Sequence, residues 1–263
     1  MNMELYFQDI KTKIIDCEVA ARLLLIDKES ICSQITKHGC WEPWLVYLYH
    51  HMIKEDFICA DVGANIGYHT VHMAKLCKGG KVYAFEPQTD IFNILSTNIL
   101  FNHLSDNVNH YRYALSNRVE KMQFNPIEEC KEKDSELLNY GGRKIVEDGE
   151  GEGSINTTRF DSLKLTKLDF LKLDIEGFEL NFLKGARKTI SSNLPIIFFE
   201  NLAWEKGRKN DKKVIKLLKR LGYKVFRSLV TEHKEDCIAL YPDKHDEALT
   251  FLHTQEEFKF QEE

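Results

Sequence analysis

The most informative stretch of the chain is Phe57-Ile-Cys-Ala-Asp61-Val-Gly63-Ala-Asn65-Ile-Gly67-Tyr68, a short apolar run that ends in an acid and continues into a glycine turn. A second apolar run, Val82–Phe85, is followed by Glu86, which lies 19 residues after Gly67. On an open parallel sheet, such a turn lets the backbone approach a ligand, and an acid at the end of the next strand accepts hydrogen bonds from ribose hydroxyls. The two runs therefore predict a site for a nucleotide-like cofactor.

The glycine spacing indicates which cofactor binds. A dinucleotide site needs G-x-G-x-x-G, because a pyrophosphate lies on the turn and on the helix N-terminus. Here Asn65 stands in the place of the middle glycine, and Asp61 lies two residues before Gly63. A carboxylate would repel a pyrophosphate, whereas S-adenosylmethionine carries a sulfonium and an amino group. We therefore predict an S-adenosylmethionine site, in which Asp61 serves the methionine end, directly or through water, and Glu86 holds the ribose. The turn residues Gly63, Asn65 and Gly67 belong to this predicted site.

Three motifs resemble those of the FkbM-type methyltransferases. They are D-V-G-A-N-I-G-Y from Asp61, F-E-P from Phe85, and L-K-L-D-I-E-G-F-E-L from Leu171, within a resemblance that runs from about Gly39 to Pro242. Members of that family use S-adenosylmethionine and mostly O-methylate sugars or natural products, so the resemblance implies the same reaction. It also implies that Glu42 lies near the cofactor cleft, since members often keep a glycine, an aromatic residue and a glutamate there.

The order of apolar patterns predicts one α/β domain over residues 57–242. Strand and helix patterns alternate, and a closing antiparallel pair fits a Rossmann-like, seven-stranded methyltransferase sheet, mostly parallel with a C-terminal antiparallel hairpin. Residues 1–56 are predicted to be a helical segment packed on this core, with two or three helices between Asp16 and Ile53. Residues 243–263 are expected to form a C-terminal tail, peripheral from Thr250 onward.

Residues 117–160 are predicted to be an insertion in this domain. A strand-like Lys121–Phe124 precedes a charged, glycine-rich stretch that ends at Ser154. A long loop in a compact domain is usually a functional lid or a disordered segment. We expect an inserted hairpin with a mobile acidic loop. This loop could be either a substrate lid or a solvated surface loop. The strand before it, Val108–Leu115, places Ala114 beside the adenine by position alone.

Four acids each end a predicted apolar strand: Asp61, Glu86, Asp174 and Glu200. Ligands of open α/β sheets bind beyond the carboxyl ends of the strands, so these acids should line one edge. With the first two assigned to the cofactor, Asp174 and Glu200 are left for the methyl group and its acceptor. A carboxylate whose pKa is raised beside other acids can take the proton of an acceptor hydroxyl. We predict Asp174, which also adjoins the cofactor, as the base, with Glu176 and Glu200 as further catalytic candidates. Glu176 could equally brace the following helix.

Metal dependence is a second possibility for the same atoms. Asp174, with Glu200 and Asn201, is similar to the residues that hold Mg²⁺ in catechol O-methyltransferases, although that enzyme has an aspartate where Glu200 stands. The seven cysteines contain no C-x-x-C pair, and no histidine metal motif is readable. One of His69 and His72 could face the cleft as a base.

Composition excludes several other classes. A hydrophobic content of 43% and a charged content of 29% are typical of globular proteins, and a net charge of −5 argues against a nucleic-acid partner. The sequence shows neither a signal-peptide pattern nor a membrane span, so we expect a cytoplasmic enzyme that acts on a small-molecule or glycan acceptor. A nucleotide-dependent oxidoreductase and a non-catalytic S-adenosylmethionine-binding protein remain as alternatives, and the oligomeric state is not predicted.

Overall fold

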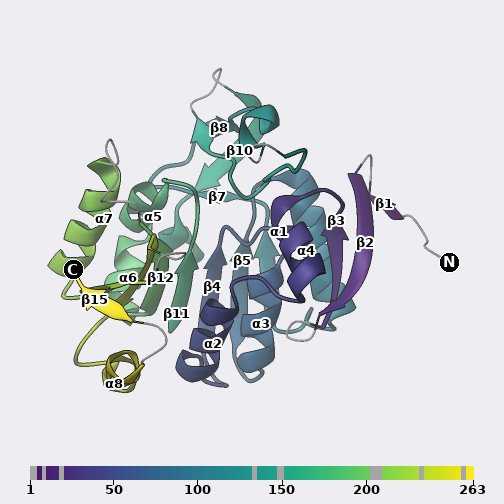
Figure 1. The fold of residues 1–263 in the computed structure, drawn as a ribbon. Helices are drawn as coiled ribbons and strands as arrows, with labels where there is room; N and C mark the ends of the chain where they lie inside the picture. Colours follow the sequence, from purple (N-terminus) through teal and green to yellow (C-terminus); the bar gives the residue numbers. More distant parts are fainter. Residues whose placement is uncertain are drawn as a thin grey trace.

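An eight-stranded mixed sheet forms the centre of the computed structural model (Figure 1), which describes residues 5–7, 10–17, 21–131, 135–146, 151–201, 209–230, 234–255 and 259–263. In spatial order the strands are β15 (Phe260–Glu262), β13 (Lys224–Ser228), β14 (Asp236–Leu240), β12 (Ile196–Glu200), β11 (Phe170–Leu173), β4 (Ile58–Val62), β5 (Lys81–Phe85) and β6 (Val108–Tyr111). The five from β12 to β6 are parallel, and the other three are antiparallel to their neighbours. The predicted Rossmann-like sheet with a closing hairpin is thus confirmed.

The C-terminal segment adds to this sheet. β15 pairs with β13 and places Glu262 opposite Phe226. The helix before it, α8 (Asp246–Thr254), buries Ala248 and Leu252 in the same core cluster as the central strands. The expectation of a peripheral tail from Thr250 was therefore wrong, because the edge of the sheet offers unpaired backbone groups and the helix has an apolar face.

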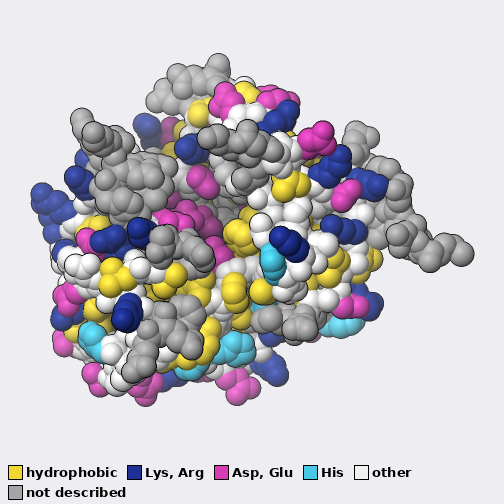
Figure 2. Space-filling model, in the orientation of Figure 1, with side chains coloured by type: hydrophobic (Ala, Val, Ile, Leu, Met, Phe, Trp, Pro, Cys, Tyr) yellow, Lys and Arg dark blue, Asp and Glu magenta, His cyan; other side chains and the backbone are white. Residues whose placement is uncertain are grey.

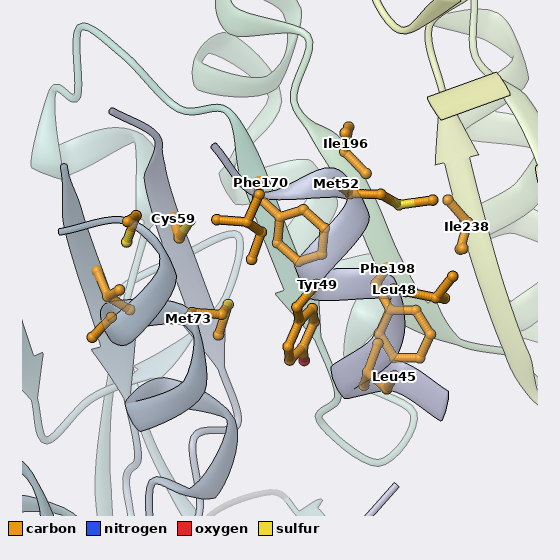
Figure 3. Close-up of a cluster of buried hydrophobic side chains, with 14 of the residues drawn as sticks. Leu45, Leu48, Tyr49, Met52, Cys59, Met73, Phe170, Ile196, Phe198 and Ile238 are labelled. Carbon is orange, nitrogen blue, oxygen red and sulfur yellow. The ribbon is translucent and has the colours of Figure 1, made fainter. Parts of the chain in front are cut away.

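Helices cover both faces of the sheet. One face carries α2 (Pro43–Met52), α3 (Tyr68–Leu76) and α8, whose apolar side chains join one core cluster with the strands. Figure 3 shows side chains of α2, among them Leu48, Tyr49 and Met52, close to Phe170 and Phe198 of the sheet. The other face carries α5 (Glu179–Gly185), α6 (Arg187–Asn193) and α7 (Lys209–Arg220), which form a second cluster. None of the described helices combines the length and apolar character needed to cross a membrane.

The N-terminal segment differs from the prediction. Between Asp16 and Ile26 the described residues are strands, not helices, and belong to a three-stranded sheet of β1 (Leu5–Phe7), β2 (Ile10–Cys17) and β3 (Ala21–Ile26). Two helices, α1 (Ser30–His38) and α2, are described here, which agrees with the predicted two or three helices between Asp16 and Ile53. Four consecutive residues of β3, Leu23–Ile26, are buried, so the strand lacks the alternation that would reveal it.

A side chain from a helix distant in sequence forms hydrogen bonds with the backbone of β3. Asn98, on α4 (Thr89–Phe101), accepts the N–H of Leu24 at 2.6 Å and donates to the carbonyl of Leu24 at 3.1 Å. It also donates to the carbonyl of Ile66, in the glycine turn, at 2.7 Å. The N-terminal sheet is therefore attached to the same turn that the sequence assigns to the cofactor.

The insertion forms its own four-stranded sheet above the carboxyl ends of the central strands (Figure 1, top). Its order is β7 (Ala114–Leu115), β10 (Glu152–Thr158), β8 (Lys121–Phe124) and β9 (Ile145–Val146), so the predicted strand Lys121–Phe124 is confirmed. The predicted strand Val108–Leu115 is divided: β6 ends at Tyr111, and β7 pairs Ala114 with Thr157. Part of the predicted acidic loop, residues 147–150, lies outside the described residues.

Candidate functional site

A cavity of about 230 Å³ lies at the carboxyl ends of β4, β5, β11 and β12. Figure 2 shows acidic side chains gathered in a hollow in the middle of this face. Seven of the residues predicted for the site line the cavity, namely Glu42, Gly63, Asn65, Glu86, Asp174, Glu176 and Glu200. The sheet edge predicted from the four strand-ending acids is thus the place where the structure is hollowed.

The glycine turn allows β4 and β11 to meet at the cavity floor. Gly63 has φ +84°, and a Cβ there would lie 1.8 Å from the carbonyl oxygen of Asp174. No side chain fits this contact, and the left-handed φ also favours glycine. Gly67 (φ +89°) begins α3, and a Cβ there would lie 2.6 Å from Leu95. Gly67 is not among the cavity-lining residues, so the structure gives it a packing role behind the turn.

Glu86 lies where the sequence predicts a ribose acceptor. Its side chain is buried, and its two oxygens accept the N–H groups of Asn65 (3.0 Å) and Gln88 (2.8 Å). Burial raises the pKa of Glu86 to about 7, even though both amides act in the opposite direction. Each carboxylate oxygen has a second lone pair, so the group can still accept hydroxyl donors from the cavity.

Asp61 is a buried residue of β4. Its side chain is fully buried, accepts the hydroxyl of Thr70 at 2.6 Å, and is not among the cavity-lining residues. In the sheet it lies opposite Lys172. Its predicted role at the methionine end, directly or through water, therefore stays a prediction. The carboxylate lies beneath the floor, where Oδ1 has no hydrogen-bond partner among the described residues.

Lys172 is a cavity-lining residue to which the sequence analysis gave no role. Its side chain is 2% exposed, and Nζ lies 2.9 Å from Oδ2 of Asp174. Burial alone would lower the pKa of Lys172, but the charges of Asp174, Asp61 and Glu42 raise it above its usual value. The ammonium therefore stays charged. In the sequence, the sign of a special role for Lys172 was its position inside the apolar run L-K-L-D.

Three carboxylates gather around the predicted base. Oxygens of Asp174, Glu176 and Glu200 lie within 4.8 Å of one another, and all three residues are partly buried. The charge of Asp174, then burial, then Glu176 raise the pKa of Glu200 well above its usual value. The cluster therefore raises the affinity of Glu200 for a proton. Asn201, the third ligand in the predicted metal set, is buried and donates its side-chain N–H to the carbonyl of Asp211 at 3.0 Å.

Glu42 lies on the opposite wall of the cavity. It begins α2 in a left-handed conformation (φ 44°), and its Oε2 lies 3.0 Å from Nε2 of His69. The other ring nitrogen of His69 is 3.2 Å from the hydroxyl of Tyr49. Burial, and then the charge of Lys172, lower the pKa of His69 to about 3, so the ring is neutral. His69 is thus a neutral neighbour of Glu42, while His72 is absent from the lining that the structure describes.

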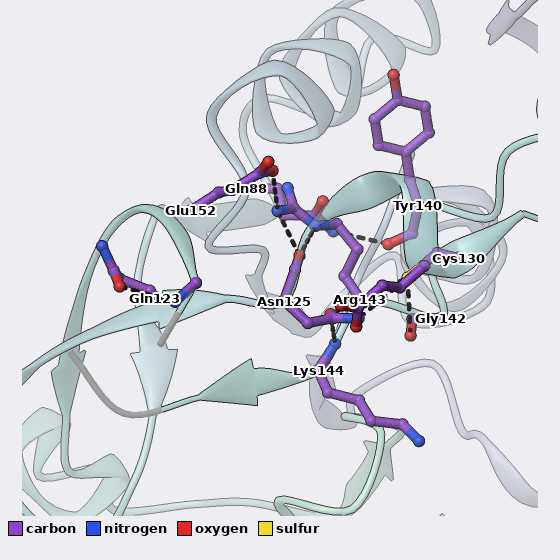
Figure 4. A network of polar contacts seen from close by, with 11 residues as sticks. Gln88, Gln123, Asn125, Cys130, Tyr140, Gly142, Arg143, Lys144 and Glu152 are labelled. Atoms are coloured by element: carbon purple, nitrogen blue, oxygen red, sulfur yellow. Dashed lines mark hydrogen bonds and ion pairs between the residues drawn. The ribbon is translucent and has the colours of Figure 1, made fainter. Parts of the chain in front are cut away.

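The insertion supplies a wall of the cavity through Phe124, Asn139, Gly141, Arg143 and Ile145. Arg143 is fixed in place: its Nε and Nη2 donate to the carbonyl of Asn125 (3.0 and 2.7 Å), and Nη2 also reaches Glu152 (3.2 Å), as Figure 4 shows. Its guanidinium lies 4.9 Å from the ring centroid of Phe124. The described part of the insertion therefore forms a wall of the cavity, and hydrogen bonds hold its side chain Arg143 in place.

Gln88 connects the insertion to the central sheet, whereas Ala114 does not line the cavity. Gln88, which follows Glu86, donates to the carbonyl of Tyr140 at 2.9 Å and so connects the insertion to the end of β5 (Figure 4). Ala114 is buried in β7 and is not among the cavity-lining residues. Its predicted place beside the adenine stays a prediction, although the chain leaves the central sheet after Tyr111 and Ala114 pairs with Thr157 in the insertion.

Comparisons with known proteins found one matching family model and several similar proteins. Residues 61–225 match the family model described as the methyltransferase FkbM domain. The chain is 33% identical over 144 residues to the hexuronic acid methyltransferase AglP of Haloferax volcanii, covering 53% of this chain and 54% of that protein. It is 26% identical over 151 residues to the methyltransferase sdnD of Sordaria araneosa, covering 48% and 58%. The matches therefore span about half the length of these curated relatives. A solved structure of methyltransferase FkbM from Methylobacillus flagellatus has a TM-score of 0.49 at 18% identity, covering 72% of this chain and 44% of that one.

Proposed function

We propose, starting from the fact that the chain belongs to the FkbM methyltransferase family, that it transfers a methyl group from S-adenosylmethionine to a hydroxyl of a sugar or related small molecule. The observation that carries the proposal is the position of Glu86 and of the Asp174 cluster in one cavity, at the two ends of the glycine turn. The similarity to a hexuronic acid methyltransferase supports an acceptor of the sugar type.

The cavity suits the charges of this cofactor. Glu86 would accept the ribose hydroxyls, and the close backbone approach at Gly63 would admit the ligand to the turn. Glu42 and Asp174 would face the methionine end, where opposite charges attract the sulfonium and amino groups. When bound, the cofactor supplies an electrophilic methyl group.

The acidic cluster would take the proton of the acceptor. Methyl transfer to oxygen needs an aligned hydroxyl and a group within reach of its proton. Asp174 is our candidate base, because Lys172 fixes one of its oxygens and because it ends the central strand of the site. Glu176 and Glu200 lie close enough to Asp174 to share the proton afterwards.

We propose that the transfer does not need a metal ion. The donor set predicted for Mg²⁺ does not fit, since the ammonium of Lys172 already pairs with Asp174. A divalent cation at Asp174 would face this buried positive charge. Methyl transfer should therefore continue in the presence of EDTA. Loss of activity with EDTA, followed by recovery with Mg²⁺, would contradict this.

Substituting the proposed base separates an enzyme from a non-catalytic binding protein. Neutral sugars and uronic acids would be screened with labelled S-adenosylmethionine, and product would be followed by mass spectrometry. Asp174→Asn should still bind S-adenosylhomocysteine, only more weakly because Asp174 faces its amino group, but it should lose turnover. Equal turnover in the variant would exclude Asp174 as the base, and cofactor binding without any product across the screen would favour a binding protein.

A further inference from the structure

One layer of helices carries an unbalanced positive charge. The exposed charged residues that the structure describes on α5, α6 and α7 are all cations, namely Lys184, Arg187, Lys188, Lys212, Lys213, Lys216, Lys219 and Arg220. The described acids of these helices, Glu179 and Asp211, are buried. The whole chain has a net charge of −5, so the basic surface is local and opposes the overall balance.

The cations of α7 form a stripe. At 100° per residue, Lys212, Lys216 and Arg220 lie together, and Lys213 and Lys219 flank them, so that all five fall within about 120° of the helix circumference. The opposite side of α7 buries Val214 and Leu218 in the core cluster of this face. The stripe therefore points outward along the length of the helix.

Four of these eight cations are not balanced by an acid among the described residues. The structure gives Lys184, Lys212, Lys216 and Arg220 no ion pair with any acid among the residues it describes. Lys212 and Lys216, and again Lys216 and Arg220, are four residues apart, a spacing at which like charges destabilise a helix. Repulsion between these cations therefore destabilises α7 in the isolated protein, and a negatively charged partner would relieve it.

The basic helices form one continuous layer. α5 contacts α7, and apolar residues of all three helices join the same core cluster against the sheet. In Figure 2, Lys and Arg side chains gather at the left, where Figure 1 places α7, away from the acidic hollow. α7 also begins near the site, since Asn201, next to Glu200, donates to the carbonyl of Asp211.

We propose that the outer surface of α5, α6 and α7 docks on an anionic phospholipid surface. A broad cationic layer fits an extended negative plane, and each lysine or arginine near such a surface contributes about 1 kcal/mol, or about fivefold in affinity. Single-stranded nucleic acids are usually bound with aromatic side chains that stack on bases, and these helices expose none among the described residues. The described cavities do not include these cations, which disfavours a small anion or a peptide in a groove.

Vesicle co-sedimentation tests this proposal on the full chain. Phosphatidylcholine vesicles with and without phosphatidylserine would be compared at low and high salt, beside a variant with Lys212→Gln, Lys216→Gln and Arg220→Gln. A control variant would carry the same charge change at three exposed lysines elsewhere, through Lys37→Gln, Lys78→Gln and Lys121→Gln. Binding of a duplex DNA of random sequence would be measured at the same salt.

The expected result is binding to phosphatidylserine vesicles only. It should weaken with salt, and the α7 variant should bind at least tenfold more weakly, while the control variant loses little. Equal losses in the two variants would overturn the proposal, because the effect would then follow net charge rather than this surface. DNA binding without vesicle binding would assign the surface to nucleic acid, and binding to neither would leave it a solvated face.

Discussion

Nζ of Lys172 lies 2.9 Å from Oδ2 of Asp174, and only 2% of the lysine side chain is exposed. Removing one partner of such a pair leaves a charge in a poorly solvated place, which is more costly than losing a surface ion pair. The pair therefore has a structural consequence that can be separated from any catalytic one.

We predict that Asp174→Asn lowers the free energy of unfolding by about 2 kcal/mol, less than for a fully buried pair because Asp174 is 30% exposed. Urea denaturation measures this directly. Asp56→Asn is the control, since it breaks the exposed pair with Lys167 and should cost much less stability. Equal losses in the two variants would show that the buried ammonium does not depend on Asp174.

Two glycines with left-handed backbones should respond differently to alanine. At Gly63 the new Cβ would meet the carbonyl of Asp174 at 1.8 Å, whereas at Gly39 (φ +75°) nothing lies within 4 Å. Gly39→Ala should cost about 1 kcal/mol, the conformational term alone. Gly63→Ala should cost at least about 3 kcal/mol and abolish cofactor binding, because the turn must move away from β11. Thermal unfolding and calorimetry test both, and a mild effect at Gly63 would refute the close contact.

The raised pKa of Glu86, about 7, predicts two pH effects of opposite sign. The usual value is 4.5, so protonated Glu86 favours the folded state, and that stability is fully present below about 4.5 and is lost as the pH rises through about 7. Ribose hydroxyls instead need the ionised carboxylate as acceptor. Affinity for S-adenosylhomocysteine should therefore rise by up to about tenfold between about pH 6 and about pH 8.

Two variants distinguish Glu86 from another buried acid in this experiment. Glu86→Gln should remove the pH dependence of binding. Burial also raises the pKa of Glu179 to about 7, but this side chain accepts the N–H groups of Ile175 and Gly177 and does not line the cavity. Glu179→Gln should therefore retain the pH dependence. A flat profile in Glu179→Gln, or an unchanged profile in Glu86→Gln, would refute the assignment.

The insertion should behave as part of the binding site. Arg143→Met removes the donors that hold the carbonyl of Asn125, so hydrogen exchange in residues 139–146 should accelerate, and affinity for S-adenosylhomocysteine should fall by about tenfold. Arg118→Met is the matched control in the same insertion, since Arg118 is exposed, pairs with Glu120 and does not line the cavity. Identical affinities in both variants would mean that the insertion is only a surface addition.

The glycine-turn half of the proposed site was predictable because its signals are local. An apolar strand, a glycine turn and an acid at the next strand end are close in sequence, and Gly63, Asn65 and Glu86 all line the cavity. Asp61 shows the limit of this reasoning. Its position at a strand end was readable, but whether the side chain points into the cavity or beneath it depends on Lys172, which lies opposite Asp61 on β11.

The remaining errors come from contacts between distant parts of the chain. β3 reads as helix because four consecutive residues are buried, and Asn98, 74 residues after Leu24, satisfies its backbone. Ala114 reads as the end of a central strand, but its partner is Thr157 in the insertion. Neither pairing leaves a periodic pattern in the sequence. For the same reason, the sequence could not predict which residues of the insertion line the cavity.

The most direct test of the central claim is calorimetric titration with S-adenosylmethionine and S-adenosylhomocysteine, with NAD as a control. The structure predicts that both methyl-cycle ligands bind with a Kd on the order of micromolar, that NAD does not bind, and that Glu86→Ala abolishes binding. Failure to bind either ligand, binding of NAD instead, or unchanged affinity in Glu86→Ala would contradict the assignment of this cavity to S-adenosylmethionine.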